Sequence, residues 1–121
     1  MNKLPPLAAV AAIFLASLLA AGCRTPVVDA TITNNTGETI RVLEVDYPNA
    51  SFGTSTLNQG ASFHYRFVIQ DPGHVSLSYS DLRGQDHKAT GPAVDKGQQG
   101  TISAVLNASG VAWTPLLSSS H

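Results

Sequence analysis

The sequence is poor in charge, aromatic rings and sulfur, and each shortage excludes a class of protein. Charged side chains make up 12% of the 121 residues, and the formal net charge is −1. Such a chain has no basic surface with which to follow a nucleic-acid backbone or to hold an anionic bilayer by charge alone. A single cysteine forms no intrachain disulfide, so a small domain must be stabilised by its hydrophobic core.

Residues 1 to 22 have the three-part layout of a secretory signal peptide. Lys3 supplies a short positive region, and an apolar stretch from Leu7 to Ala21 is broken only by Ser17. A transmembrane helix is the alternative, but a span needs about 20 apolar residues and this run is shorter. We therefore expect a helical signal peptide that is cleaved, and an exported protein.

The segment AAGC, residues 20 to 23, follows two leucines and resembles the lipobox of bacterial lipoproteins. In that family the signal is cut just before the cysteine, the thiol is acylated, and the cysteine becomes the new N-terminus. The resemblance implies a lipid on Cys23, with the protein anchored in the cell membrane or the outer membrane. Ala20 stands where the family prefers leucine. The alternative is an ordinary signal cut near Ala21, which leaves an unpaired thiol.

A lipidated tether over residues 23–26 would be very short. Only Arg24, Thr25 and Pro26 separate Cys23 from the first apolar strand residues, a reach of about 10–15 Å when extended. The domain would then lie against the bilayer, held by its lipid chains. The sorting rules of enteric lipoproteins would send a cysteine followed by Arg24, rather than by Asp, to the outer membrane.

The rest of the chain alternates short apolar stretches with turn signals and shows no helical period. We expect about seven or eight strands in an all-β, antiparallel β-sandwich of immunoglobulin-like architecture over residues 27–115. A disordered tail is expected over residues 116–121. The cysteine pair of antibody-type domains is missing, so the label describes architecture alone. The mature part, with TITNNTGE opening a strand-rich domain, also resembles small uncharacterised bacterial lipoproteins.

Two strands show features that constrain the sheets. Residues 39 to 47 change the phase of their apolar side chains midway, which predicts a bulge or a strand buried on both faces. Residues 51 to 57 are rich in serine and threonine and predict an edge strand. The expected core comprises Ile32, Val42, Phe63, Tyr65, Phe67, Leu77, Tyr79, Ile102 and Trp113.

The clearest alternation lies in residues 61 to 70 and 74 to 80, separated by Asp71-Pro72-Gly73. If the two segments form a hairpin, apolar side chains must face apolar ones. We therefore predict that Phe67 lies opposite Leu77 and that a three-residue loop joins the strands.

Candidate chemical groups are few and dispersed. His64, His74 and His87 do not converge in the expected register, and no His-x-His pair or carboxylate cluster lies beside them at metal-ligand spacing. Asp81 and Asp86 bracket a turn, an ordinary position for aspartate. The sequence has neither a nucleophile elbow nor a phosphate-binding glycine loop. We expect no enzyme activity, no catalytic residue, no cofactor and no metal; Cys23 is the one site residue.

The function that best fits these features is a membrane-anchored, non-catalytic binding or structural module of the cell envelope. Its partner would be an envelope protein rather than a nucleic acid, contacted through an exposed strand edge such as Ser51 to Leu57. A small-ligand carrier or sensor is the alternative and requires a cavity between the sheets. An enzyme would require polar residues distant in sequence to meet in a cleft.

Overall fold

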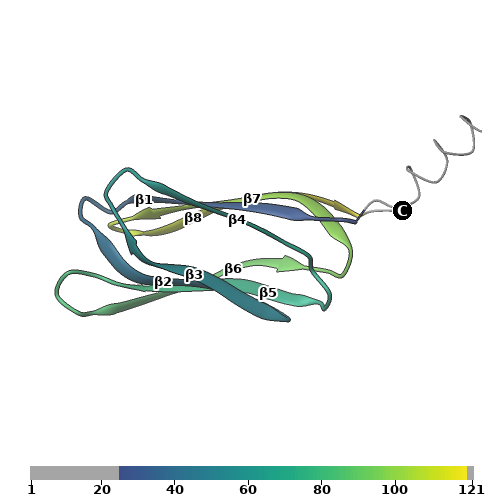
Figure 1. Cartoon of the computed structure of the whole chain (residues 1–121), viewed down its shortest axis with the longest axis horizontal. Coiled ribbons are helices and arrows are strands. Elements are labelled where there is room, and N and C mark those ends of the chain that lie inside the picture. The colour runs from purple at the N-terminus through teal and green to yellow at the C-terminus, as the bar shows by residue number, and fades with distance from the viewer. Residues whose placement is uncertain (1–24, 120–121) are drawn as a thin grey trace, which may run out of the picture.

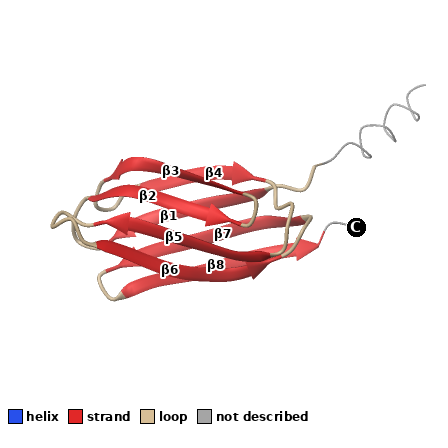
Figure 2. Ribbon diagram, turned by 90° about the horizontal axis from the view of Figure 1, so that it is seen from below, coloured by secondary structure: helices blue, strands red, loops and turns tan. Residues whose placement is uncertain are grey.

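The computed structural model describes residues 25–119, which form eight strands in two stacked sheets (Figures 1 and 2). The strands are β1 (Val28–Asn35), β2 (Ile40–Tyr47), β3 (Ala50–Leu57), β4 (Ser62–Phe67), β5 (Gly73–Ser80), β6 (Asp86–Val94), β7 (Gln98–Asn107) and β8 (Gly110–Ser119). Sheet A has the order β4-β1-β7-β8 and sheet B the order β3-β2-β5-β6. The expected β-sandwich is confirmed, and β3 lies at an edge as predicted.

The expected signal peptide and Cys23 lie outside the described residues. Within residues 25–119, no helix has the length and apolar character needed to cross a membrane. Neighbouring strands are antiparallel except β1 and β7, which run parallel with Val28 beside Gly100. The expectation of a wholly antiparallel sandwich is therefore wrong for this pair, because β1 and β7 enter sheet A from the same end.

The core forms where the inward faces of the two sheets meet. Five of the expected core side chains are buried: Ile32, Phe67, Leu77, Tyr79 and Ile102. Phe63 and Trp113 are partly buried and pack against that core. Each fully buried aliphatic or aromatic side chain contributes about 1.5–3 kcal/mol relative to exposure, which suits a domain that has no disulfide in its described part.

Val42 and Tyr65 correct the core prediction, because their side chains are 64% and 42% exposed. Val42 lies at the predicted bulge: the register of β2 against β5 shifts between Arg41 and Glu44. The backbone of Val42 has φ of +51°, which is rare for a β-branched residue. The extra residue places Leu43 in the core and turns Val42 outward.

The predicted hairpin between residues 61–70 and 74–80 is wrong. β4 pairs with β1 in sheet A, so that Phe67 lies opposite Val28, whereas β5 lies in sheet B with Leu77 opposite Val45. The connecting chain crosses from one sheet to the other, and buried Ile69 packs at the crossing. Alternation had identified the inward faces correctly, but it carries no information about which strand is the neighbour.

The predicted disordered tail is also corrected over residues 116–119, which form the last part of β8. β7 is ten residues long and offers backbone partners as far as the pair Gln98–Ser119. Leu117 packs against the core from this segment. Apolar contacts and the hydrogen bonds with β7 therefore order residues 116–119, although the serine-rich sequence there is typical of a disordered tail.

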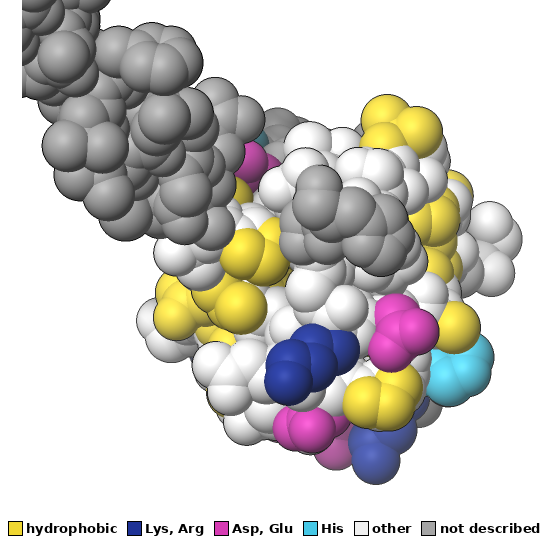
Figure 3. Space-filling view, turned by 90° about the vertical axis from the view of Figure 1, so that its right-hand side faces the viewer, with side chains coloured by type: hydrophobic (Ala, Val, Ile, Leu, Met, Phe, Trp, Pro, Cys, Tyr) yellow, Lys and Arg dark blue, Asp and Glu magenta, His cyan; other side chains and the backbone are white. Residues whose placement is uncertain are grey.

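The strands run between two distinct ends of the sandwich. β1 begins at one end, which Figure 3 faces; apolar, acidic and basic side chains are interspersed there. The turns between β1 and β2, β3 and β4, β5 and β6, and β7 and β8 gather at the other end (Figure 1). We call this second end the distal end, because the described chain enters at the first.

Candidate functional site

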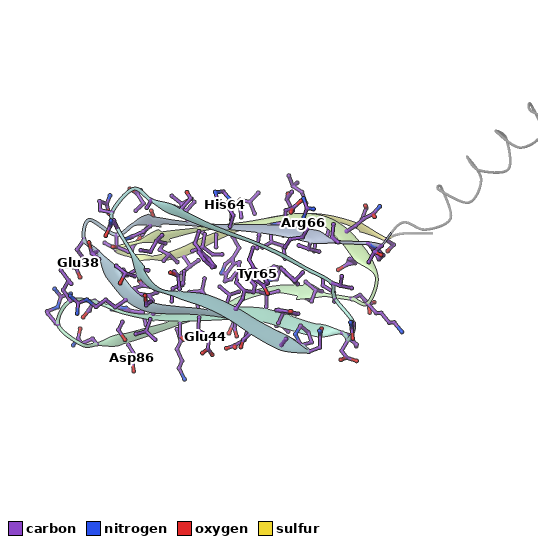
Figure 4. All side chains as sticks on the ribbon, in the orientation of Figure 1. Glu38, Glu44, His64, Tyr65, Arg66 and Asp86 are labelled. Atoms are coloured by element: carbon purple, nitrogen blue, oxygen red, sulfur yellow. The ribbon has the colours of Figure 1, made fainter. Side chains whose placement is uncertain are left out.

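Aromatic rings fill the space between β3 and β4, two edge strands that lie on the same side of the sandwich in different sheets. Phe52 of β3 stacks on Tyr65 of β4, with ring centroids 4.3 Å apart and planes 12° apart. Tyr47 lies 4.3 Å from Phe67, centroid to centroid. Figure 4 shows Tyr65 between the layers, with His64 and Arg66 on the outer face of sheet A. We call this surface the β3–β4 side.

The backbone of β4 exposes hydrogen-bonding groups on its free edge. The N–H of Asn34 donates to the carbonyl of Ala61 at 3.0 Å, which fixes the phase of the β1–β4 ladder. Because bonded pairs recur at every second residue in an antiparallel pair, Phe63 and Tyr65 bond to β1. Ser62, His64 and Arg66 then direct their N–H and carbonyl groups away from β1.

The opposite side of the sandwich, between β6 and β8, is closed by proline and tryptophan. Pro92 lies in β6 and Pro115 in β8, and proline on an edge strand blocks further pairing. Pro115 is opposite Ile102, at a position whose N–H would otherwise point outward. The Trp113 ring lies against Gly91, where an added Cβ would be 2.8 Å from it. β3 and β4 contain no proline.

The chain segment that forms the β3–β4 side carries one basic residue and no acidic residue. The sequence contains no aspartate or glutamate from Tyr47 to Gln70, and Arg66 is the only lysine or arginine there. Nε of Arg66 donates to Asp29 at 2.8 Å, and this hydrogen bond raises the pKa of Arg66. A guanidinium has five N–H donors, so a second acidic group could still bind beside Asp29.

A polar cluster lies at the distal end, centred on the buried carboxylate of Asp81. Oδ1 accepts the backbone N–H groups of Arg83 at 2.9 Å and Gln85 at 3.0 Å, and Oδ2 accepts from His87 Nε2 at 2.9 Å. The hydrogen bond from His87, followed by that from the Gln85 backbone, lowers the pKa of Asp81 to about 2. Asp81 thus closes the β5–β6 turn, as predicted for a turn-forming aspartate.

The His87 ring is fixed in orientation by two contacts. It stacks on Tyr79 with centroids 4.9 Å apart, and its Nε2–H points at the ionised Asp81 carboxylate, which accepts only. The adjoining cavity of about 150 Å³ is lined by Glu38 and Arg83, among others. This volume is below the 300–1,000 Å³ or so typical of small-molecule sites. The cluster is therefore better explained as stabilising the β5–β6 turn than as a ligand site.

The other sequence candidates lie apart. His64 contacts the hydroxyl of Thr31 at 3.1 Å, and His74 contacts the carbonyl of Gly91 at 3.1 Å. Asp86 accepts from Ser80 at 2.7 Å. Among residues 25–119, no group of three or more histidine, cysteine or acidic side chains is placed to hold a metal.

The buried Asp81 predicts an acid-sensitive stability. A carboxyl whose pKa falls from 3.8 to about 2 on folding stabilises the fold fully above pH 4 or so, and this contribution is lost as pH falls toward 2. We expect Asp81→Asn to lower Tm at pH 6 and to match the wild type near pH 2. Asp86→Asn, which neutralises an exposed carboxylate that accepts one hydrogen bond from Ser80, is the control. A gap in Tm between wild type and Asp81→Asn that persists unchanged at pH 2 would contradict the assignment.

Sequence reasoning missed the aromatic contacts and the Asp81–His87 bond. Tyr65 shares its phase with Phe67 on the same strand, so alternation alone could not distinguish the exposed Tyr65 from the buried Phe67. Asp81 and His87 flank one turn, which is the single sequence signal that could have paired them. Comparison with protein-family models, curated protein sequences and solved structures gave no significant match to this chain.

Proposed function

We propose that this protein is an exported lipoprotein, anchored through lipid on Cys23, whose β-sandwich is a non-catalytic binding module of the cell envelope. An immunoglobulin-like arrangement is the architecture we assign to it, because three hairpins, β2–β3, β5–β6 and β7–β8, are joined by connections that cross between the two sheets. The partner is an envelope protein, contacted within reach of the membrane.

The observation that carries this proposal is the distance along the chain between Cys23 and the fold. β1 begins at Val28, and Val28 is already a fully buried core residue. A tether of four residues spans about 14 Å when extended, so an anchor at Cys23 would hold the entry end of the sandwich against the bilayer. The β3–β4 side and the distal end would both stay accessible to a partner.

The close packing of the core favours a binding function at the surface over a ligand site between the sheets. Seventeen apolar side chains are buried within residues 25–119, and aromatic rings of the two sheets contact one another across the interior. A carrier of organic ligands needs a cavity of about 300 Å³ or more, and opening one would require displacing these side chains.

Membrane fractionation of wild type and Cys23→Ser tests the anchor. We expect the wild type to stay with membranes through high-salt and alkaline washes, and Cys23→Ser to be released, because one thiol carries the attachment. Equal melting temperatures of the two proteins would show that the substitution leaves the fold intact. Retention of Cys23→Ser in washed membranes would instead indicate an uncleaved span and contradict the proposal.

Cross-linking in native membranes then tests the binding role. The proposal predicts a defined envelope protein that is captured by the wild type and lost with Cys23→Ser, which no longer concentrates at the membrane. Recovery of the same abundant proteins by both forms would count against a tethered binding module.

A further inference from the structure

We propose that β4 is a docking strand: an extended segment of a partner polypeptide pairs with its free edge and continues sheet A. The inference rests on the proposed binding function and specifies its surface and the kind of partner. The first ground is the backbone. Ser62, His64 and Arg66 alternate along β4 with the residues that bond to β1, so a row of donors and acceptors points outward at the spacing of a new strand.

The two edges on the opposite side of the sandwich are less suited to pairing. β6 and β8 carry Pro92 and Pro115. β3 and β4 lack proline, and each keeps one register against its neighbour. Of the two, β4 carries the exposed side chains of Tyr65 and Arg66 beside its free edge. Natural sheets block the edges that must not pair, and here the block is present on one side of the sandwich and missing on the other.

The side chains beside β4 define the chemistry of the partner segment. On the inner face, the added strand would meet Tyr65, which is 42% exposed and stacked on buried Phe52. On the outer face it would lie beside His64 and Arg66, on a side with no acidic residue of its own between Tyr47 and Gln70. The segment that fits alternates apolar residues with polar ones and carries a carboxylate on the polar face.

A second copy of this chain fits the same edge poorly. In a two-fold antiparallel pairing of β4 with itself, the outward-facing residues must lie opposite one another. A pairing centred on His64 would place Arg66 of each copy opposite Ser62 of the other, so neither guanidinium would meet a carboxylate of the added strand. Opposite charges on neighbouring strands stabilise a sheet, and β4 has no acidic residue to offer Arg66 of a second copy, so we assign the edge to a different, acidic polypeptide.

Selection from a library of short random peptides on the full chain in detergent micelles tests this inference. We expect selected peptides to alternate apolar and polar residues and to contain an acidic residue. Their addition should shift the backbone amide signals of Ser62, His64 and Arg66 in NMR spectra and slow the hydrogen exchange of these amides. A selected peptide, resynthesised, is then the probe for variants.

Two substitutions separate backbone pairing from side-chain contact. His64→Pro removes an outward N–H and should weaken binding of the probe at least about tenfold, whereas His64→Ala keeps the N–H and should change it less than about threefold. If His64→Pro fails to fold, Ser62→Pro replaces it, because proline is tolerated at the first residue of a strand. Melting temperatures identify which variants are folded.

Several results would overturn the docking strand. They are the selection of no binding peptide, amide shifts confined to β3, β8 or the distal end, full binding by a folded proline variant, or self-association through the β4 amides. None of these depends on Cys23, because the protein is in micelles. If no peptide pairs with β4 but membrane attachment still depends on Cys23, the docking strand is rejected and the proposal of a lipid-anchored binding module is not.

Discussion

Replacement of Gly100 by alanine is expected to destabilise the fold by about 3 kcal/mol or more. Gly100 lies in β7, between Val28 and Leu117, and its φ is +133°. An alanine Cβ would overlap the carbonyl oxygen of Leu116 in addition to requiring a backbone conformation that L-residues rarely adopt. Urea unfolding of the wild type and the variant measures the difference in unfolding free energy.

Gly84→Ala is the matched control for this experiment. Gly84 also has positive φ, +83°, but an added Cβ would have no atom within 4 Å. Its replacement should cost only the conformational strain, about 1–2 kcal/mol. Equal losses for Gly84→Ala and Gly100→Ala would contradict the close approach of β7 to β8 that the structure shows.

Asn34→Ala is expected to cost about 3 kcal/mol, because it removes four hydrogen bonds inside the fold. The Asn34 side chain is fully buried. Its Nδ2 donates to the carbonyls of Glu38 at 2.8 Å and Leu57 at 2.9 Å, and its Oδ1 accepts from the backbone N–H and the hydroxyl of Thr36. Asn34 therefore joins the β1–β2 turn to the end of β3.

The next residue offers a control of the same type. Asn35 is exposed, and its Nδ2 donates to Asn107 at 3.3 Å, so Asn35→Ala should change the unfolding free energy by less than about 0.5 kcal/mol. In a domain of this size, 3 kcal/mol or so corresponds to a fall in Tm of more than roughly 10 °C. A similar Tm for Asn34→Ala and Asn35→Ala would contradict a stabilising role for the hydrogen bonds that join the β1–β2 turn to the end of β3.

Periodicity predicted the layers of this fold well and its connections poorly. Ile32, Leu77 and Ile102 were assigned to the core because each follows a two-residue alternation, and each is buried. Phe67 was also placed inward correctly, yet it was paired with Leu77 instead of Val28. Which face a side chain occupies is a local property, whereas the neighbour of a strand depends on the path of the intervening loop.

The candidate surface could be predicted only in part for the same reason. The edge position of β3 followed from its weak, hydroxyl-rich sequence, but β4 has the strongest alternation in the chain and gave no sign that it also lies at an edge. Asn34 and Asn35 are identical in type and adjacent at the end of β1, and asparagine is a residue type typical of turns, so the full burial of Asn34 was not predicted. These differences arise from contacts between segments more than twenty residues apart.

The central claim, a lipid anchor on Cys23, is tested most directly by the intact mass of the protein extracted from membranes. We expect a chain that begins at Cys23 and carries the added mass of at least two acyl chains, since about two are needed for stable anchoring. A chain with unmodified Cys23, whether it begins at Met1 or near residue 22, would contradict the account.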